Sequence, residues 1–259
     1  MGVVNMTKIV KVKDVNIGEG IPKIAVPLVG TDDMELIEEI KQLEGIKFDV
    51  VEWRVDYYKN VEDVNAVKSV LEKIRSILPN TPILFTFRTK KEGGEKEVSN
   101  EYYVKLNCEI AKTKKVDLVD IELFTGDNFV KEVVEIAHSN GVKVVISNHD
   151  FFKTPAKEEI VSRLRKMIEL KADLPKIAVM PQSEDDVLTL LCATNEMKQK
   201  HSDQPIITMS MSGIGVISRL CGEFFGSVLT FGAAKKASAP GQIGVEDLNT
   251  VLQIIHRSL

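Results

Sequence analysis

Short apolar runs rich in valine and isoleucine alternate with longer amphipathic stretches along almost the whole chain. Such runs are typical of buried parallel strands, and the amphipathic stretches between them are typical of helices that cover a sheet. Eight runs recur at intervals of roughly 30 residues, the spacing that an eightfold α/β barrel requires. They are Lys23–Leu28, Asp49–Arg54, Pro82–Arg88, Val116–Glu122, Lys143–His149, Leu174–Pro181, Pro205–Met211 and Ser227–Ala233. We therefore predict an α/β fold, the (β/α)8 TIM barrel.

No linker interrupts these repeats, so we predict one domain over residues 1–259. Residues 1–22 form an N-terminal extension in which alternating apolar residues flank Lys13 and Asp14. This pattern predicts a short hairpin that closes the bottom of the barrel. Residues 234–244 follow the last strand, and their small residues and glycines are typical of a mobile lid.

Charge and hydropathy exclude several classes of partner. The chain has 34 lysines and arginines against 38 aspartates and glutamates, and the basic residues are spread along it, so nucleic acid is not expected. No apolar run approaches the roughly 20 residues of a membrane helix. The cysteines lie far apart, without the spacing of a metal site or a disulfide framework. We expect a cytoplasmic protein without a membrane partner and, because barrels commonly pair through their outer helices, a homodimer.

Polar side chains gather where the predicted strands end. In (β/α)8 barrels the active site lies at the carboxyl ends of the strands, so charged residues there carry functional information. Strands two to six of the prediction all contribute such residues. They are Glu52, Arg54, Asp56, Arg88, Glu92, Asp120, Glu122, Asn148, His149, Asp150 and Lys176.

Lys176 lies inside an apolar strand, where burial of an ammonium group is costly. One interpretation is a lysine that reaches solvent at the start of the strand or pairs with Asp173. The other is a nucleophile, because desolvation and neighbouring cations increase the fraction of neutral amine that can form a Schiff base. Arginines at the same end of the barrel can supply those cations; they are Arg54, Arg88 and Arg219.

His149 ends a strand, whereas the other three histidines lie in predicted helices. Imidazole accepts and returns protons near neutral pH, so His149 is a candidate general acid and base. The alternative is a hydrogen-bonded structural histidine. A lysine on the adjacent strand favours the catalytic interpretation.

The carboxylates at the strand ends have a second interpretation as ligands of Mg²⁺, which prefers oxygen donors. Arg54 follows Glu52 by two residues, so both side chains face the same way along a strand and are expected to form an ion pair. We therefore predict no metal. After strand seven, a glycine-rich loop at Gly213 and Gly215 precedes Arg219, whose guanidinium suits either a carboxylate or a phosphate.

These segments together form a pattern that extends through almost the whole chain. Its parts are Val51-Glu52-Trp53-Arg54-Val55-Asp56, Phe85-Thr86-Phe87-Arg88 with Glu92-Gly93-Gly94, Ser147-Asn148-His149-Asp150-Phe151, Lys176-Ile177-Ala178, Met209-Ser210-Met211 with Arg219, and Ser238-Ala239-Pro240-Gly241-Gln242. The pattern resembles type I 3-dehydroquinate dehydratase, the Schiff-base dehydratase of the shikimate pathway, which serves aromatic amino acid biosynthesis.

The resemblance implies a role for each matching residue. Lys176 is similar to the imine-forming lysine, His149 to the acid and base, and Glu92 to the group that orients the histidine. Arg219 is similar to the residue that binds the substrate carboxylate. The remaining substrate contacts implied by the resemblance are Glu52, Arg54, Arg88, Ser238, Gln242, Met209, Met211 and Phe151.

The implied reaction is a syn elimination of water from 3-dehydroquinate to give 3-dehydroshikimate, without a cofactor, because the lysine imine itself serves as the electron sink. Two alternatives share the barrel. A class I aldolase or transaldolase also forms a lysine imine but cleaves a sugar phosphate, and a non-catalytic barrel binds a small acid without covalent chemistry.

Overall fold

The computed structural model describes residues 8–201, 203–234 and 238–259. Eight parallel strands form the barrel. Their order in the sheet is the order along the chain from β3 to β9, and β10 lies beside β3. The ring closes between β9 and β10, where Ile206 and Ser227 form a parallel bridge and Val228 N donates to Ile206 O at 3.0 Å. The strands are β3 (Lys23–Leu28), β4 (Val50–Arg54), β5 (Ile83–Thr86), β6 (Leu118–Glu122), β7 (Lys143–Asp150), β8 (Leu174–Val179), β9 (Ile207–Ser210) and β10 (Leu229–Ala233).

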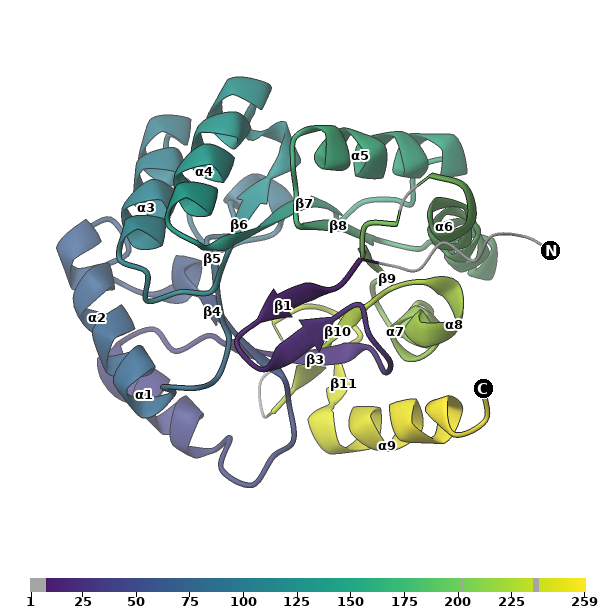
Figure 1. The fold of residues 1–259 in the computed structure, drawn as a ribbon, viewed down its shortest axis with the longest axis horizontal. Coiled ribbons are helices and arrows are strands. Elements are labelled where there is room, and N and C mark those ends of the chain that lie inside the picture. Colours follow the sequence, from purple (N-terminus) through teal and green to yellow (C-terminus); the bar gives the residue numbers. More distant parts are fainter. Residues whose placement is uncertain (1–7, 202, 235–237) are drawn as a thin grey trace.

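The (β/α)8 prediction is confirmed, and each strand begins and ends within two residues of its predicted bounds. Helices cover the outside of the sheet (Figure 1). They are α1 (Asp33–Lys41), α2 (Val64–Ile77), α3 (Asn100–Lys112), α4 (Asp127–Ser139), α5 (Lys157–Glu169), α6 (Glu184–Glu196), α7 (Val216–Leu220), α8 (Gly222–Phe225) and α9 (Val245–His256). The short 3₁₀ helices are η1 (Val55–Tyr57), η2 (Lys90–Glu92) and η3 (Leu123–Thr125), and η4 (Met197–His201) is a π-helix that continues α6.

The hydrophobic core has two layers, as alternation along the strands requires. One layer lies between the sheet and the helices and contains Trp53 and Phe85, whose rings meet edge to face with centroids 5.7 Å apart. The other fills the inside of the barrel and contains Val50, Leu84 and Leu118. The inner layer leaves room for polar side chains at one end of the barrel.

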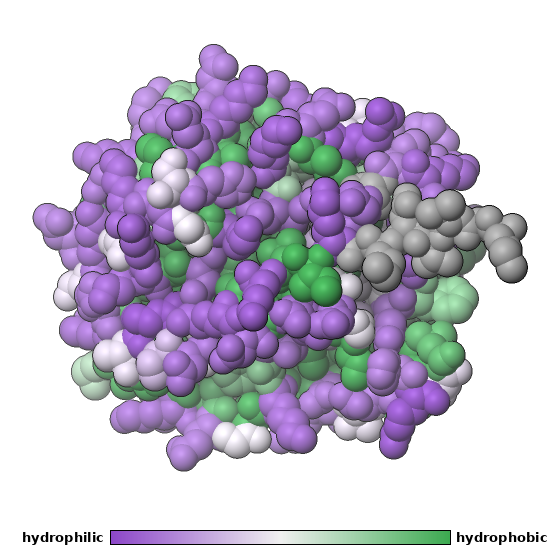
Figure 2. Space-filling model, viewed as in Figure 1, coloured by the Kyte–Doolittle hydropathy of each residue, from purple (hydrophilic) through white to green (hydrophobic). Residues whose placement is uncertain are grey.

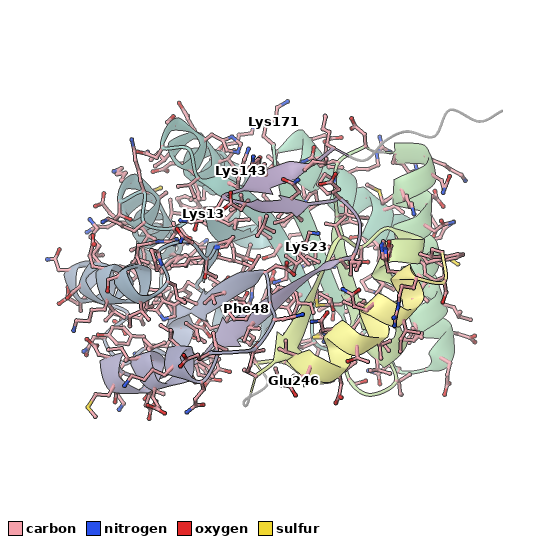
Figure 3. All side chains as sticks on the ribbon, turned by 60° about the horizontal axis from the view of Figure 1, so that its bottom comes forward. Lys13, Lys23, Phe48, Lys143, Lys171 and Glu246 are labelled. Carbon is pink, nitrogen blue, oxygen red and sulfur yellow. The ribbon has the colours of Figure 1, made fainter. Side chains whose placement is uncertain are left out.

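An antiparallel hairpin of β1 (Val10–Val12) and β2 (Val15–Ile17) closes the other end of the barrel, as predicted. Its side chains Val10, Val12 and Ile17 pack in the inner core layer. Figure 3 shows Lys13, at the tip of the hairpin, on the same face as Lys143 and Lys23, which begin β7 and β3. Residues 1–7 of the predicted extension lie outside the described residues.

The predicted lid, residues 234–244, contains a strand that the sequence did not indicate. β11 (Ile243–Gly244) runs parallel to β10 and pairs Ile243 with Gly232. Residues 235–237 of the lid lie outside the described part of the chain, and its mobility stays a prediction.

Over the described residues, no helix has the length and apolar character needed to cross a lipid bilayer. Figure 2 shows a face that is mostly hydrophilic, with hydrophobic side chains in small separate groups.

Candidate active site

A narrow cavity of about 40 Å³ opens at the carboxyl ends of the barrel strands. All twelve side chains predicted for the site line it. They are Glu52, Arg54, Arg88, Glu92, His149, Phe151, Lys176, Met209, Met211, Arg219, Ser238 and Gln242. A larger hollow of about 640 Å³ lies between β3 and α1, but its lining lacks histidine and arginine, so the chemistry belongs to the narrow cavity.

Lys176 points into the barrel from β8 and is 4 % exposed. Its Nζ lies 3.8 Å from Glu52 Oε1, 3.8 Å from Asp120 Oδ2 and 4.4 Å from the centre of the Phe231 ring. Burial lowers the pKa of Lys176, and the positive charges of Arg88 and Arg54 lower it further against the opposing carboxylates. The amine is therefore easier to deprotonate than an ordinary lysine, as a Schiff-base nucleophile requires.

His149 lies on β7, the strand next to Lys176. The two strands pair so that Ser147 lies beside Lys176 and His149 beside Ala178, which brings the imidazole to the same end of the barrel as the amine. Nδ1 of His149 lies 3.0 Å from Glu92 Oε2, and the backbone N of His149 donates to the same oxygen at 2.8 Å. When Glu92 is ionised its oxygens only accept hydrogen bonds, so in that form of the dyad Nδ1 carries the proton and Nε2 is free to accept one.

The side chains of His149 and Glu92 are only 10 % and 8 % exposed, where they line the cavity. Burial raises the pKa of Glu92 to about 8, and the negative charge of Glu122 adds to the rise. Burial also lowers the pKa of His149 well below its usual value, with further lowering by Arg88 and Lys176. The two groups share a hydrogen bond, so they gain and lose protons as a pair rather than independently.

Arg88 holds the carboxylates under the cavity in place. Its guanidinium lies 2.9 Å from Asp120 Oδ2 and 2.9 Å from Glu122 Oε1, and it also donates to Ser147 Oγ at 2.9 Å. Ser147 Oγ in turn donates to Asp120 Oδ1 at 2.7 Å. These contacts fix Asp120, which is one of the two carboxylates that face Lys176.

The predicted ion pair between Arg54 and Glu52 is wrong. Arg54 instead makes two hydrogen bonds of 2.8 Å to Asp56, because the turn η1 brings that carboxylate back beside the end of β4. Glu52 accepts from Thr86 Oγ1 at 3.0 Å and faces Lys176. Among the described residues, no group of three or more histidines, cysteines and acidic residues is arranged to hold a metal ion.

Arg219, on α7, is buried with no acidic partner among the described residues. Its Nη2 donates to Pro240 O at 3.1 Å, while Nε is buried without a hydrogen-bond partner. Burial alone lowers the pKa of Arg219 to about 10. A buried guanidinium that faces a cavity without a counter-ion is suited to bind an anionic group of a ligand.

Ser238, Ala239 and Gln242 line this side of the cavity. Ser238 N donates to Gln242 Oε1 at 2.8 Å, and Gln242 Nε2 donates to Ser238 Oγ at 3.1 Å. Arg54 Nη1 reaches Ser238 O at 3.4 Å, which joins the loop to β4.

Position 93 requires glycine for two reasons. Its φ of +86° lies in the left-handed region, and a Cβ there would come within 2.3 Å of the Phe151 ring. The close approach places Phe151 next to Glu92, against the wall of the cavity.

Sequence reasoning gave no role to several residues that complete the site. Asp56 and Asp120 were recognised as charged strand ends, but their partners were not foreseen. Phe231, which contacts Lys176 from β10, is an apolar residue in a buried strand, and nothing in the sequence separates it from ordinary core residues.

Comparisons with known proteins agree with this geometry. A model of the family described as Type I 3-dehydroquinase matches residues 24–258. The 3-dehydroquinate dehydratase of Clostridium botulinum is 64% identical over 254 residues, 98% of this chain and 100% of that protein, and the one from Clostridioides difficile is 60% identical over the same shares.

Solved structures give the same result. The type I 3-dehydroquinate dehydratase of Clostridium difficile, crystallised with covalently modified comenic acid, superposes with a TM-score of 0.95 at 59% identity and covers 98% of this chain and 100% of that chain. The Enterococcus faecalis 3-dehydroquinate dehydratase superposes with a TM-score of 0.89 at 46% identity, over 95% and 98% of the two chains. The chain therefore belongs to the type I 3-dehydroquinase family.

Proposed function

We propose that this chain dehydrates 3-dehydroquinate to 3-dehydroshikimate through an imine on Lys176. The observation that carries the proposal is the convergence on one cavity of a buried amine, a hydrogen-bonded His–Glu dyad and an arginine without an acidic partner among the described residues. Membership of the type I 3-dehydroquinase family favours this function over the aldolase and the non-catalytic barrel.

The reaction begins with imine formation. The neutral amine of Lys176 attacks the C3 carbonyl of the substrate, and the carbinolamine loses water to give an iminium ion. The Glu52 and Asp120 carboxylates near Nζ stabilise this positive charge. The iminium withdraws electrons from the neighbouring C2–H bond and makes its proton more acidic.

His149 then moves the proton. Nε2 accepts the proton from C2, which leaves an enamine, and Glu92 stabilises the imidazolium that forms. The enamine electrons expel the C1 hydroxyl, which leaves as water with the proton that His149 returns. Removal and return by one histidine imply that proton and hydroxyl depart from the same face, a syn elimination. Water finally hydrolyses the iminium, which releases the conjugated enone and restores the amine.

A direct assay tests the function. The purified chain incubated with 3-dehydroquinate is expected to generate the ultraviolet absorbance of a conjugated enone carboxylate. No absorbance change with a folded chain at micromolar concentration would refute the proposal.

Arg219 is proposed to bind the substrate carboxylate, and Arg219→Met is expected to raise KM by about 10- to 100-fold, the effect of losing a hydrogen bond to a charged group. Because Arg219 has no acidic partner in the described structure, the variant should unfold at the same or a higher temperature. Arg88→Met is the matched comparison, because it strands buried Asp120 and Glu122 and is expected to cost about 3–5 kcal/mol of stability. Wild-type KM in Arg219→Met would reject the role.

We also propose that the chain acts in the cytoplasm as a homodimer. The three cysteines are free, with Cys192 exposed, which suits a reducing compartment. The apolar hollow between β3 and α1, beside exposed Met34, offers a surface for a second copy. Sedimentation at the mass of a single chain would contradict the dimer.

A further inference from the structure

A line of polar contacts runs from the outer helix α5 to the catalytic dyad. Arg163, on α5, donates from Nη1 to Asn148 Oδ1 at 2.8 Å and from Nε to Glu159 Oε1 at 2.8 Å. Its guanidinium also lies over the Phe124 ring, 5.3 Å from the ring centre. These contacts hold the arginine between the helix and the end of β7.

The contact with Arg163 fixes the orientation of the Asn148 amide. A guanidinium has donors and no acceptor, so it selects the oxygen of the amide and turns the nitrogen the other way. Nδ2 of Asn148 then donates to Glu92 Oε1 at 3.2 Å. Asn148 and its hydrogen bond to Glu92 are buried, so bulk solvent does not replace that donor, whereas the bond from Arg163 is part-buried.

Glu92 is therefore held at both carboxylate oxygens. Oε1 accepts from Asn148, and Oε2 accepts from the backbone and the imidazole of His149. The charged groups that face Glu92 are Arg88, which follows β5 and lies 3.7 Å from Oε2, and Glu122 at the end of β6. Burial and Glu122 favour a proton on Glu92, whereas Arg88, Asn148 and the His149 N–H favour the carboxylate.

We propose that Asn148 and Arg163 are positioning residues that orient Glu92 and favour its ionised form, so that His149 presents an unprotonated Nε2 to the substrate. This inference rests on the proposed roles of Glu92 and His149 in dehydration. Neither Asn148 nor Arg163 lines the cavity, and both act through the dyad.

The test is the pH dependence of kcat in full-length variants. Asn148→Leu keeps the side chain's size and removes the donor to Glu92. Without that donor the pKa of Glu92 rises further, so the proton that inactivates the dyad is lost only at higher pH. We expect the acidic limb of the kcat profile to move up by about one pH unit, and kcat at neutral pH to fall about tenfold, with KM unchanged. Arg163→Met should shift the limb in the same direction, because the amide is then free to turn.

Two further variants separate positioning from simple support of the fold. Arg163→Lys keeps a donor for Asn148 Oδ1 and is expected to restore most of the wild-type profile. Arg165→Met removes an exposed arginine two residues along the same helix and should leave the profile unchanged. An Asn148→Leu variant that loses thermal stability or kcat while keeping the wild-type acidic limb would overturn the inference.

The outcome is distinguishable from failure of the proposed function. With 3-dehydroquinate and sodium borohydride, which reduces an imine to a stable adduct, Asn148→Leu and Arg163→Met should still be modified on Lys176, because neither substitution touches the amine. If the wild-type chain did not convert 3-dehydroquinate, the proposed function would fail. If His149→Ala were inactive while Asn148→Leu kept the wild-type pH profile, the positioning inference alone would fail.

Discussion

Lys176→Met is expected to abolish both the covalent adduct and turnover. The methionine side chain fills nearly the same space but has no nucleophile, so neither the iminium nor the electron sink can form. Loss of a covalent nucleophile lowers kcat on the order of 10⁴- to 10⁶-fold. The measurement is the rate of enone formation with substrate at saturation.

The fold of this variant provides the control. Lys176 lies 3.8 Å from both Glu52 and Asp120, so its removal leaves two carboxylates with one fewer positive neighbour. Asp120 keeps Arg88 at 2.9 Å, and Glu52 keeps the hydrogen bond from Thr86. The variant should therefore remain folded in a thermal unfolding experiment. A folded variant with kcat within tenfold of wild type would exclude Lys176 as the nucleophile.

His149→Ala is expected to separate imine formation from elimination. The variant retains Lys176, so it should still form the trapped adduct, but it lacks the group that moves the C2 proton. Positioned acid and base catalysis contributes about 10²- to 10⁴-fold, and kcat should fall by that range. Mass analysis of the trapped protein and the enone assay measure the two steps separately.

His256→Ala is the matched control for this variant. His256 lies at the exposed end of α9, where it contacts Glu223, and it does not line the cavity. It should turn over at the wild-type rate. Equal activity of the two variants would remove His149 from the mechanism.

The barrel was predictable because its signal repeats. Buried strands such as β7 and β8 require apolar side chains on both faces, and the helices between them require an apolar stripe. The same two patterns therefore recur in each β/α unit and support one assignment. β11 has two residues and no periodicity of its own. It pairs with β10 only because the chain returns to the barrel there, which local sequence does not encode.

The membership of the site was predictable, but its pairings were not. Alternation along β4 correctly puts Glu52 and Arg54 on one face, yet the turn η1 decides that Asp56 is the carboxylate within reach of Arg54. Glu52 is thereby left to face Lys176. Arg163 gave no signal at all, because an arginine in an amphipathic helix resembles any surface residue until α5 is docked beside Asn148.

Chemical trapping tests the central claim most directly. The full-length chain is incubated with 3-dehydroquinate and sodium borohydride, digested, and its peptides are weighed by mass spectrometry. A reduced, stable adduct on the peptide that contains Lys176, absent from Lys176→Met, is the expected result. An unmodified Lys176 in a chain that converts the substrate, or an adduct on a different lysine, would contradict the imine mechanism.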